Sequence, residues 1–154
     1  MEIERKFLVR SLPDNLDSYP HRVIEQGYLA TSPTVRVRRY GNDFILTVKE
    51  HIATPGTIVN REEEFALTAE SYDRLLSMCD GIILSKTRYR IPLHDSLVAE
   101  LDIFSGAHLG LMIVEVEFPD VESALAFEPP CWFGDDVSHK PEYRNSYLAS
   151  HKSK

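Results

Sequence analysis

The stretch MEIERKFLV at residues 1–9 alternates charged and apolar side chains with a two-residue period. Successive side chains of an extended strand point to opposite faces, so Glu2, Glu4 and Lys6 share one face. Ile3 and Phe7 lie on the other face of the same strand. Two acids and one base on a single face indicate either a face in contact with water or a face that holds a charged ligand.

The same alternation continues through the rest of the chain. It is found in Val35–Tyr40, Phe44–Glu50, Arg61–Leu67, Ser85–Ile91, Val98–Phe104 and Leu111–Phe118. Helical patterns are fewer: Thr68 can cap a helix to about Cys79, Asp120 can cap one to Phe127, and a third is expected within Tyr143–Ser150. The Pro-rich stretch Pro129–Asp136 is expected to be a loop. Many strands with few helices predict an α+β protein built on an antiparallel sheet.

Length and charge narrow the class of protein. A chain of 154 residues is most simply one domain, spanning 1–154, with a substantial core. The formal net charge of −7 argues against nucleic acid or an anionic membrane as a partner, although basic residues can still gather locally. The N-terminal stretch is charged from residue 2 and no long apolar run follows, so we expect a cytoplasmic protein without a membrane segment.

The charged faces carry pairs of one sign at alternate positions. The acidic pairs are Glu2/Glu4, Glu62/Glu64, Glu100/Asp102 and Glu115/Glu117, and the basic pairs are Arg36/Arg38 and Lys86/Arg88, with Lys6 and Lys49 beside them. Paired carboxylates suit a hard divalent cation such as Mg²⁺ or Mn²⁺, and paired bases suit phosphate oxygens. An antiparallel sheet commonly has one solvated face, but a sheet closed into a barrel would direct all these pairs into one lumen. The alternation by itself leaves both readings open.

The first segment also matches a known signature. Glu2-Ile3-Glu4-Arg5-Lys6 resembles the ExExK motif of the CYTH proteins, also called triphosphate tunnel metalloenzymes. Further segments resemble the family in the same order: Glu25–Thr31, Val35–Glu50, Glu62–Phe65, Ser85–Ile91, Glu100–Phe104, Leu111–Phe118, Pro129–Ser138 and Tyr143–Ala149. The likeness therefore spans nearly the whole chain, and it is greatest to the short, single-domain bacterial members.

The resemblance implies a closed antiparallel β-barrel of about eight strands, with a charged tunnel and a few flanking helices. It also implies hydrolysis of a triphosphate, most simply inorganic tripolyphosphate, with Mg²⁺ or Mn²⁺. Matching positions assign phosphate binding to Lys6, Arg36, Arg38, Lys49, Lys86 and Arg88, and metal binding to Glu2, Glu4, Glu62, Glu64, Glu115 and Glu117. Tyr28 matches a tunnel tyrosine suggested as a proton acceptor, and Lys6 is the second candidate catalytic residue.

Several assignments stay open at this stage. Arg61 has the parity opposite to Glu62 and Glu64, and Lys140 and Arg144 are the two candidates for an arginine of the family near the C-terminus. Glu100 and Asp102 are a further metal-side pair, an exposed strand face or salt-bridge partners of the basic residues. Cyclisation of ATP, hydrolysis of thiamine triphosphate, and non-catalytic binding of polyphosphate or a nucleotide are the alternative functions. The sequence also leaves a homodimer open.

Overall fold

The computed structural model describes residues 1–151 and contains a single large sheet. Its strands are β1 (Glu2–Val9), β2 (His21–Thr31), β3 (Thr34–Tyr40), β4 (Asp43–Ile52), β5 (Ile58–Ala66), β6 (Asp80–Pro92), β7 (Val98–Ser105), β8 (Met112–Glu117) and β9 (Phe133–Asp136). The helices are α1 (Ala69–Ser77), α2 (Val121–Ala126) and α3 (Asn145–Leu148), with 3₁₀ turns η1 (Leu16–Ser18), η2 (Gly106–His108) and η3 (Pro141–Tyr143).

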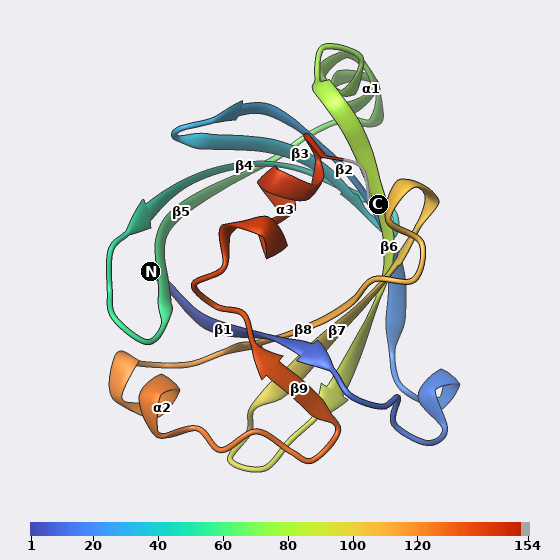
Figure 1. Cartoon of the computed structure of the whole chain (residues 1–154). Coiled ribbons are helices and arrows are strands. Elements are labelled where there is room, and N and C mark those ends of the chain that lie inside the picture. Colours follow the sequence, from blue (N-terminus) through green and yellow to red (C-terminus); the bar gives the residue numbers. More distant parts are fainter. Residues whose placement is uncertain (152–154) are drawn as a thin grey trace.

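Eight of the strands close into a barrel. The strand order is β5-β4-β3-β2-β6-β7-β8-β1-β9, and β5 also pairs with β1, so β1 to β8 form the ring seen in Figure 1. Each barrel pair is antiparallel. The prediction of a closed antiparallel barrel of about eight strands is therefore confirmed.

The closing seam lies between β1 and β5. Three residue pairs make it, Glu2↔Asn60, Ile3↔Val59 and Glu4↔Ile58, whereas five pairs from Glu4 to Leu8 join β1 to β8. Beyond β5, the same edge of β1 is covered by β9, in the register Phe7↔Asp136 and Val9↔Phe133. The loop expected over Pro129–Asp136 is thus wrong at Phe133–Asp136, because an uncovered edge of β1 offers backbone partners there.

The largest apolar cluster lies on the outside of the barrel wall. The ring of Phe7 on β1 packs at a tilt, with its centroid 5.1 Å from that of Phe133 and 6.1 Å from that of Phe127. The other buried members are Ile91, Ala99, Leu101, Val114, Val116, Phe118 and Ala124. Figure 1 shows α2 and β9 on the outside of the ring, where they cover this apolar face. The alternate residues of β1, β7 and β8 therefore face the lumen.

The expected helices are present, with capped starts. Thr68 Oγ1 accepts a hydrogen bond from the Ser71 N–H at 3.1 Å, and Asp120 Oδ1 accepts one from the Ser123 N–H at 2.6 Å. The third predicted helix is confined to Asn145–Leu148. Within residues 1–151, no helix is long and apolar enough to cross a membrane.

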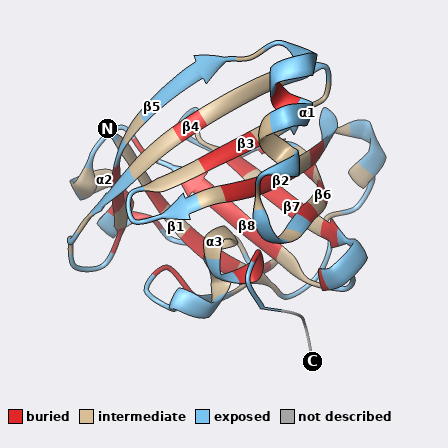
Figure 2. Cartoon of the chain, turned by 90° about the horizontal axis from the view of Figure 1, so that it is seen from above, coloured by how far each residue is buried: buried red, intermediate tan, exposed pale blue. Residues whose placement is uncertain are grey.

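The C-terminal segment, residues 140–149, lies against one end of the barrel. In Figure 1, α3 projects within the ring of strands, and Figure 2 shows it beside the barrel end. The Leu148 side chain is buried with Tyr28, Leu84 and Phe104. The Ile82 N–H on β6 donates to the carbonyl oxygen of Ala149 at 2.6 Å. Backbone and side-chain contacts together hold this segment in place.

Candidate active site

A charged cavity of about 910 Å³ occupies the interior of the barrel. Its wall contains Glu2, Glu4, Lys6, Tyr28, Arg36, Arg38, Lys49, Glu62, Glu64, Arg88, Glu115 and Glu117, all of which the sequence placed in the site. The remaining predicted residue, Lys86, has a fully buried side chain behind this wall. The barrel therefore brings residues of seven strands together around one lumen.

Arginines of β3 form the core of the basic wall. Arg36 Nη2 donates to Thr47 Oγ1 at 3.3 Å, and its buried Nε has no hydrogen-bond partner. Arg38 Nε donates to Gln26 Oε1 at 2.7 Å, and Gln26 Nε2 donates to the Tyr28 hydroxyl at 3.2 Å. Burial, followed by repulsion from Arg36 and Arg88, lowers the pKa of Arg38 to about 9. This wall has positive charge and an unused donor, which are the properties of an anion site.

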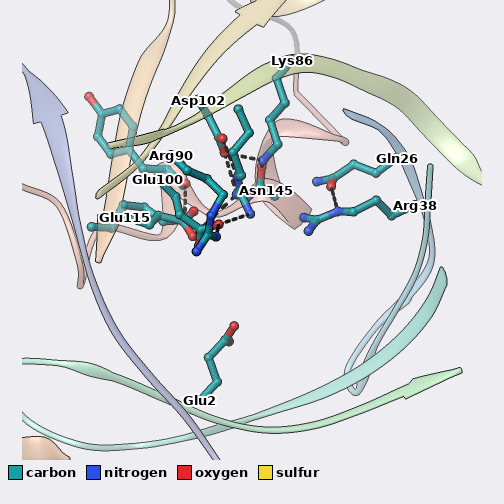
Figure 3. A network of polar contacts seen from close by, with 12 residues as sticks. Glu2, Gln26, Arg38, Lys86, Arg90, Glu100, Asp102, Glu115 and Asn145 are labelled. Atoms are coloured by element: carbon teal, nitrogen blue, oxygen red, sulfur yellow. Dashed lines mark hydrogen bonds and ion pairs between the residues drawn. The ribbon is translucent and has the colours of Figure 1, made fainter. Parts of the chain in front are cut away.

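Arg88 extends the basic wall on β6 and is fixed by a carboxylate behind it. Its Nε and Nη2 donate to the two oxygens of Asp102 at 2.7 and 2.9 Å. Asp102 Oδ2 also lies 2.7 Å from Lys86 Nζ, and Figure 3 shows Asp102 and Lys86 on one wall of the barrel. The side chain of Asp102 is 1% exposed, so this carboxylate is a salt-bridge partner of the bases and not part of the cavity surface.

Glu2 and Glu4 project from β1 on the opposite wall. Figure 3 shows Glu2 across the lumen from Arg38 and Lys86. Lys49 Nζ lies 2.9 Å from Glu2 Oε1 and 3.7 Å from Glu62 Oε2. Burial and then the charges of Glu115 and Glu2 raise the pKa of Glu4 to about 8. Burial and Glu2 likewise raise the pKa of Glu62 to about 7. These carboxylates repel one another, and a cation among them would relieve that repulsion.

Glu115 and Lys6 connect the acidic and basic walls. Glu115 Oε1 lies 3.6 Å from Lys6 Nζ, and its Oε2 lies 3.9 Å from Arg88 Nη2. Burial alone would raise the pKa of Glu115, but Lys6 and Arg88 bring that pKa well below its usual value. Glu64 and Glu117 line the cavity as exposed residues. The carboxylates of the cavity therefore range from strongly paired to freely accessible.

The donor set fits a divalent cation in its chemistry. Carboxylate oxygens are the ligands that Mg²⁺ and Mn²⁺ prefer, and β1, β5 and β8 bring several of them to one cavity. The buried Oε2 of Glu62 accepts no hydrogen bond. Across residues 1–151, however, no three His, Cys, Asp or Glu side chains already form a coordination group. The carboxylates would have to turn from their lysine partners to bind a cation.

Comparison with known proteins agrees with this architecture. The CYTH domain model matches residues 1–128. The chain belongs to the CYTH family. An inorganic triphosphatase of Nitrosomonas europaea is 40% identical over 153 residues, covering 96% of each chain. An inorganic triphosphatase of Acetivibrio thermocellus is 34% identical, covering 99% of this chain and 96% of the relative.

Solved structures also resemble this CYTH protein. A crystal structure of an inorganic triphosphatase superposes with a TM-score of 0.73 at 35% identity, covering 100% of this chain and 97% of the other. A putative adenylyl cyclase from Hippeastrum with a dominant triphosphatase activity has a TM-score of 0.62 at 18% identity, covering 79% and 81%. The second likeness is one of fold alone.

The structure places the residues left open by the sequence. Arg61 is exposed and outside the cavity wall, in agreement with its parity. Glu100 lines the cavity and lies 3.4 Å from Arg88 and 3.0 Å from Arg90. Of the two C-terminal candidates, Arg144 lines the cavity and Lys140 does not.

Sequence reasoning missed several uncharged residues that line the CYTH cavity or support its wall. Asn60 donates to Glu2 Oε1 at 3.0 Å, and Gln26 joins Arg38 to Tyr28. Asn60 shares the parity of Glu62, and Gln26 shares that of Tyr28, so strand alternation could have identified both. Asn145 reaches the cavity from α3, and no strand pattern signals that contact.

Proposed function

We propose that this CYTH protein hydrolyses inorganic tripolyphosphate to pyrophosphate and phosphate, with Mg²⁺ or Mn²⁺ as cofactor. The observation that carries the proposal is one barrel cavity whose wall combines the arginines Arg36, Arg38 and Arg88 with the carboxylates of β1, β5 and β8. The two inorganic triphosphatases described above, each similar over nearly its whole length, support the same substrate.

The arginines supply the binding of the polyanion. Arg36, Arg38 and Arg88 lie within one cavity, and guanidinium groups match phosphate oxygens through paired hydrogen bonds. The free Nε of Arg36 is a donor that a phosphate oxygen would satisfy. Burial makes each charged hydrogen bond stronger than it would be in water. A substrate with several negative charges would offset the mutual repulsion of these bases.

The acidic wall supplies the cation site. Glu2, Glu4, Glu62 and Glu115 would hold the metal, with Glu64 and Glu117 at exposed positions of the same cavity. When bound, the cation neutralises charge on the phosphate oxygens and lowers the pKa of a coordinated water. Lys49, now between Glu2 and Glu62, would be free to contact phosphate once those carboxylates turn to a cation.

Hydrolysis requires one water and one proton acceptor. The water oxygen bonds to a terminal phosphorus, the bridging P–O bond breaks, and its electrons leave with pyrophosphate. Positioning and charge neutralisation supply most of the rate enhancement in such phosphoryl transfers. Tyr28 (with its hydroxyl bonded to Gln26), Lys6 (beside Glu115) or one of the carboxylates would orient the water or receive its proton.

The lining favours tripolyphosphate over nucleoside or thiamine triphosphates. The nucleobase of a nucleoside triphosphate, or a thiazolium ring, needs an apolar or aromatic surface to stack on. Among the described residues of the cavity wall, Tyr28 is the only Phe, Tyr or Trp, and this residue is 6% exposed. The cavity therefore offers charge for a phosphate chain and little surface for an attached ring.

Phosphate release from tripolyphosphate, with Mg²⁺, with Mn²⁺ and with EDTA, tests the proposal. Arg38→Met removes charged hydrogen bonds worth ~1.5–3 kcal/mol, so kcat/KM should fall at least about tenfold. Glu4→Gln should raise the Mg²⁺ concentration needed for half-maximal activity. Arg61 is an exposed arginine of β5 that does not line the cavity, so Arg61→Ala is the matched control and should retain wild-type kinetics.

A substrate panel separates the alternatives. ATP, thiamine triphosphate, pyrophosphate and long-chain polyphosphate should be cleaved more slowly than tripolyphosphate. Preferential cleavage of ATP or thiamine triphosphate would overturn the substrate assignment. Tight binding of tripolyphosphate without release of phosphate, with either metal, would instead identify a non-catalytic polyphosphate-binding protein.

A further inference from the structure

Lys86, which the family resemblance assigns to phosphate binding, is buried away from solvent. Its side chain is 0% exposed, and its Nζ lies 2.7 Å from Asp102 Oδ2 on β7. Nζ also donates to Asn145 Oδ1 on α3 at 3.1 Å, and it lies 5.2 Å from the centroid of the Phe104 ring. Two other elements, β7 and α3, therefore surround this ammonium group of β6.

The C-terminal segment contacts a second lysine in the same way. Lys6 Nζ on β1 donates to the Tyr143 carbonyl oxygen at 3.1 Å. Residues 140–149 lie beyond the region 1–128 that the CYTH model matches. They nevertheless supply Arg144, Asn145 and Ser146 to the cavity wall. This segment thus contributes polar groups to the site as well as apolar packing.

Asp102 links Lys86 to the cavity surface. It accepts two hydrogen bonds from Arg88, whose side chain is 8% exposed and faces the cavity, and it pairs with Lys86 behind that arginine. A carboxylate that holds both bases fixes the direction of the Arg88 guanidinium. With Lys86 and Arg88 both charged, this group of three keeps one net positive charge beside the lumen.

We propose that Asn145 is a positioning residue for the basic wall, holding the Lys86 ammonium against Asp102 so that the Asp102 carboxylate keeps the Arg88 guanidinium directed at the triphosphate. The amide oxygen of Asn145 is an acceptor for the charged form of the lysine, which burial disfavours. Loss of that acceptor leaves one N–H of the buried Lys86 ammonium without a partner, while Asp102 still accepts from another. The inference rests on the proposed function, because it assigns α3 a part in binding the same polyanion.

The titration of Lys86 supports the geometry. Burial, together with repulsion from Arg88 and Arg38, lowers the pKa of Lys86 to about 7, although Asp102 and Glu115 act in the opposite direction. Asn145 is the neutral member of this environment, and it contacts the ammonium directly. A neutral replacement of Asn145 should therefore move the lysine pKa without changing any other charge of the wall.

NMR titration of ¹³C-labelled lysine side chains tests the inference without any substrate. The signal of Lys86 is assigned by its loss in Lys86→Arg. Asn145→Leu removes the acceptor and should lower the Lys86 pKa, whereas Asn145→Asp adds a carboxylate and should raise it. Asn145→Gln should return the pKa toward the wild-type value. Glu142→Gln, an exposed change in η3 of the same segment, is the control and should leave it unmoved.

Kinetics with Mg²⁺ and tripolyphosphate give the second readout. Asn145→Leu should raise KM roughly tenfold, or ~1.4 kcal/mol, at pH 8 with a smaller change in kcat. In Lys86→Met/Asn145→Leu, the second change should add little, because both act through one ammonium group. An unmoved Lys86 pKa in Asn145→Leu, or additive losses in the double variant, would overturn the inference. A moved pKa in a protein that neither binds nor cleaves tripolyphosphate would support the positioning and overturn the proposed function.

Discussion

Lys86 and Asp102 form an ion pair with almost no solvent contact, at side-chain exposures of 0% and 1%. Breaking such a pair commonly costs ~3–5 kcal/mol, because the remaining charge is left buried and unpaired. Lys86→Met should cost less than that here, since Asp102 keeps its two hydrogen bonds from Arg88. The same shared carboxylate therefore serves stability and the orientation of the cavity wall.

The depressed pKa of Lys86 predicts a pH dependence of stability. Its folded-state pKa is about 7 and the usual pKa of lysine is 10.5, so between these values the unfolded chain binds more protons. Stability should rise with pH across that window, by up to ~1.4 kcal/mol per pH unit. Asp102, Arg88, Arg38 and Glu115 are the charged groups that set the shift.

Urea unfolding at pH 7, 8 and 9 measures this effect as a difference between wild type and Lys86→Met. The difference in unfolding free energy should move in favour of wild type as pH rises. Lys140→Met, which removes an exposed lysine, controls for loss of one positive charge. A constant difference between wild type and Lys86→Met would show that Lys86 stays charged throughout this range.

Residue alternation predicted which face a side chain occupies, but not how deeply it lies. Lys86 and Arg88 share one face of β6, yet Arg88 lines the cavity and Lys86 is covered through its contact with α3. That covering residue, Asn145, is 59 positions away in sequence. Gln26 could not be identified from charged pairs, because its side chain is neutral. Its amide group joins Arg38 to Tyr28 by hydrogen bonds.

At the scale of elements, the helices were the most predictable parts because their signals are local. Thr68 and Asp120 begin α1 and α2 as their sequence positions indicate. β9 was not predicted, because its partner is the distant edge of β1 and its own sequence is rich in loop-forming residues. Strand pairing over such separations is set by the whole fold and not by propensity.

The cap of α1 gives an element-scale prediction. Thr68→Ala removes the acceptor for the Ser71 N–H and should cost ~1 kcal/mol of stability, read from the urea midpoint. Turnover should stay unchanged, since α1 packs outside the barrel through Tyr72, which lies 5.1 Å from Phe44 and donates to Glu25. Thr68→Ser, which keeps the oxygen, should retain most of the stability. A loss of turnover at unchanged stability would contradict this separation of roles.

At the scale of the whole molecule, the barrel is least extensively paired where its ends meet. The β1–β5 seam has three residue pairs, against five for β7–β8. The same seam carries Glu2 and Glu4, and Lys49 on neighbouring β4 lies 2.9 Å from Glu2. The alternation of charge could not establish this closure, because β2, β3 and β4 lie between β1 and β5 in the sequence. Closure is nevertheless what converts separate charged faces into one site.

Hydrogen exchange should show the seam as the part of the barrel that a ligand stabilises most. Without ligand, the backbone amides of residues 2–4 and 58–60 should exchange faster than those of β7 and β8, because fewer pairs must open. Tripolyphosphate with Mg²⁺ at about 100 times Kd adds ~2.7 kcal/mol to global stability. Since the carboxylates of β1 and β5 would share that ligand, protection at the seam should increase more than at β7–β8. Equal gains in protection at β1–β5 and at β7–β8 would mean that the ligand stabilises an already rigid barrel. Slower exchange at β1–β5 than at β7–β8 before ligand addition would contradict the assignment of β1–β5 as the weakest pairing of the barrel.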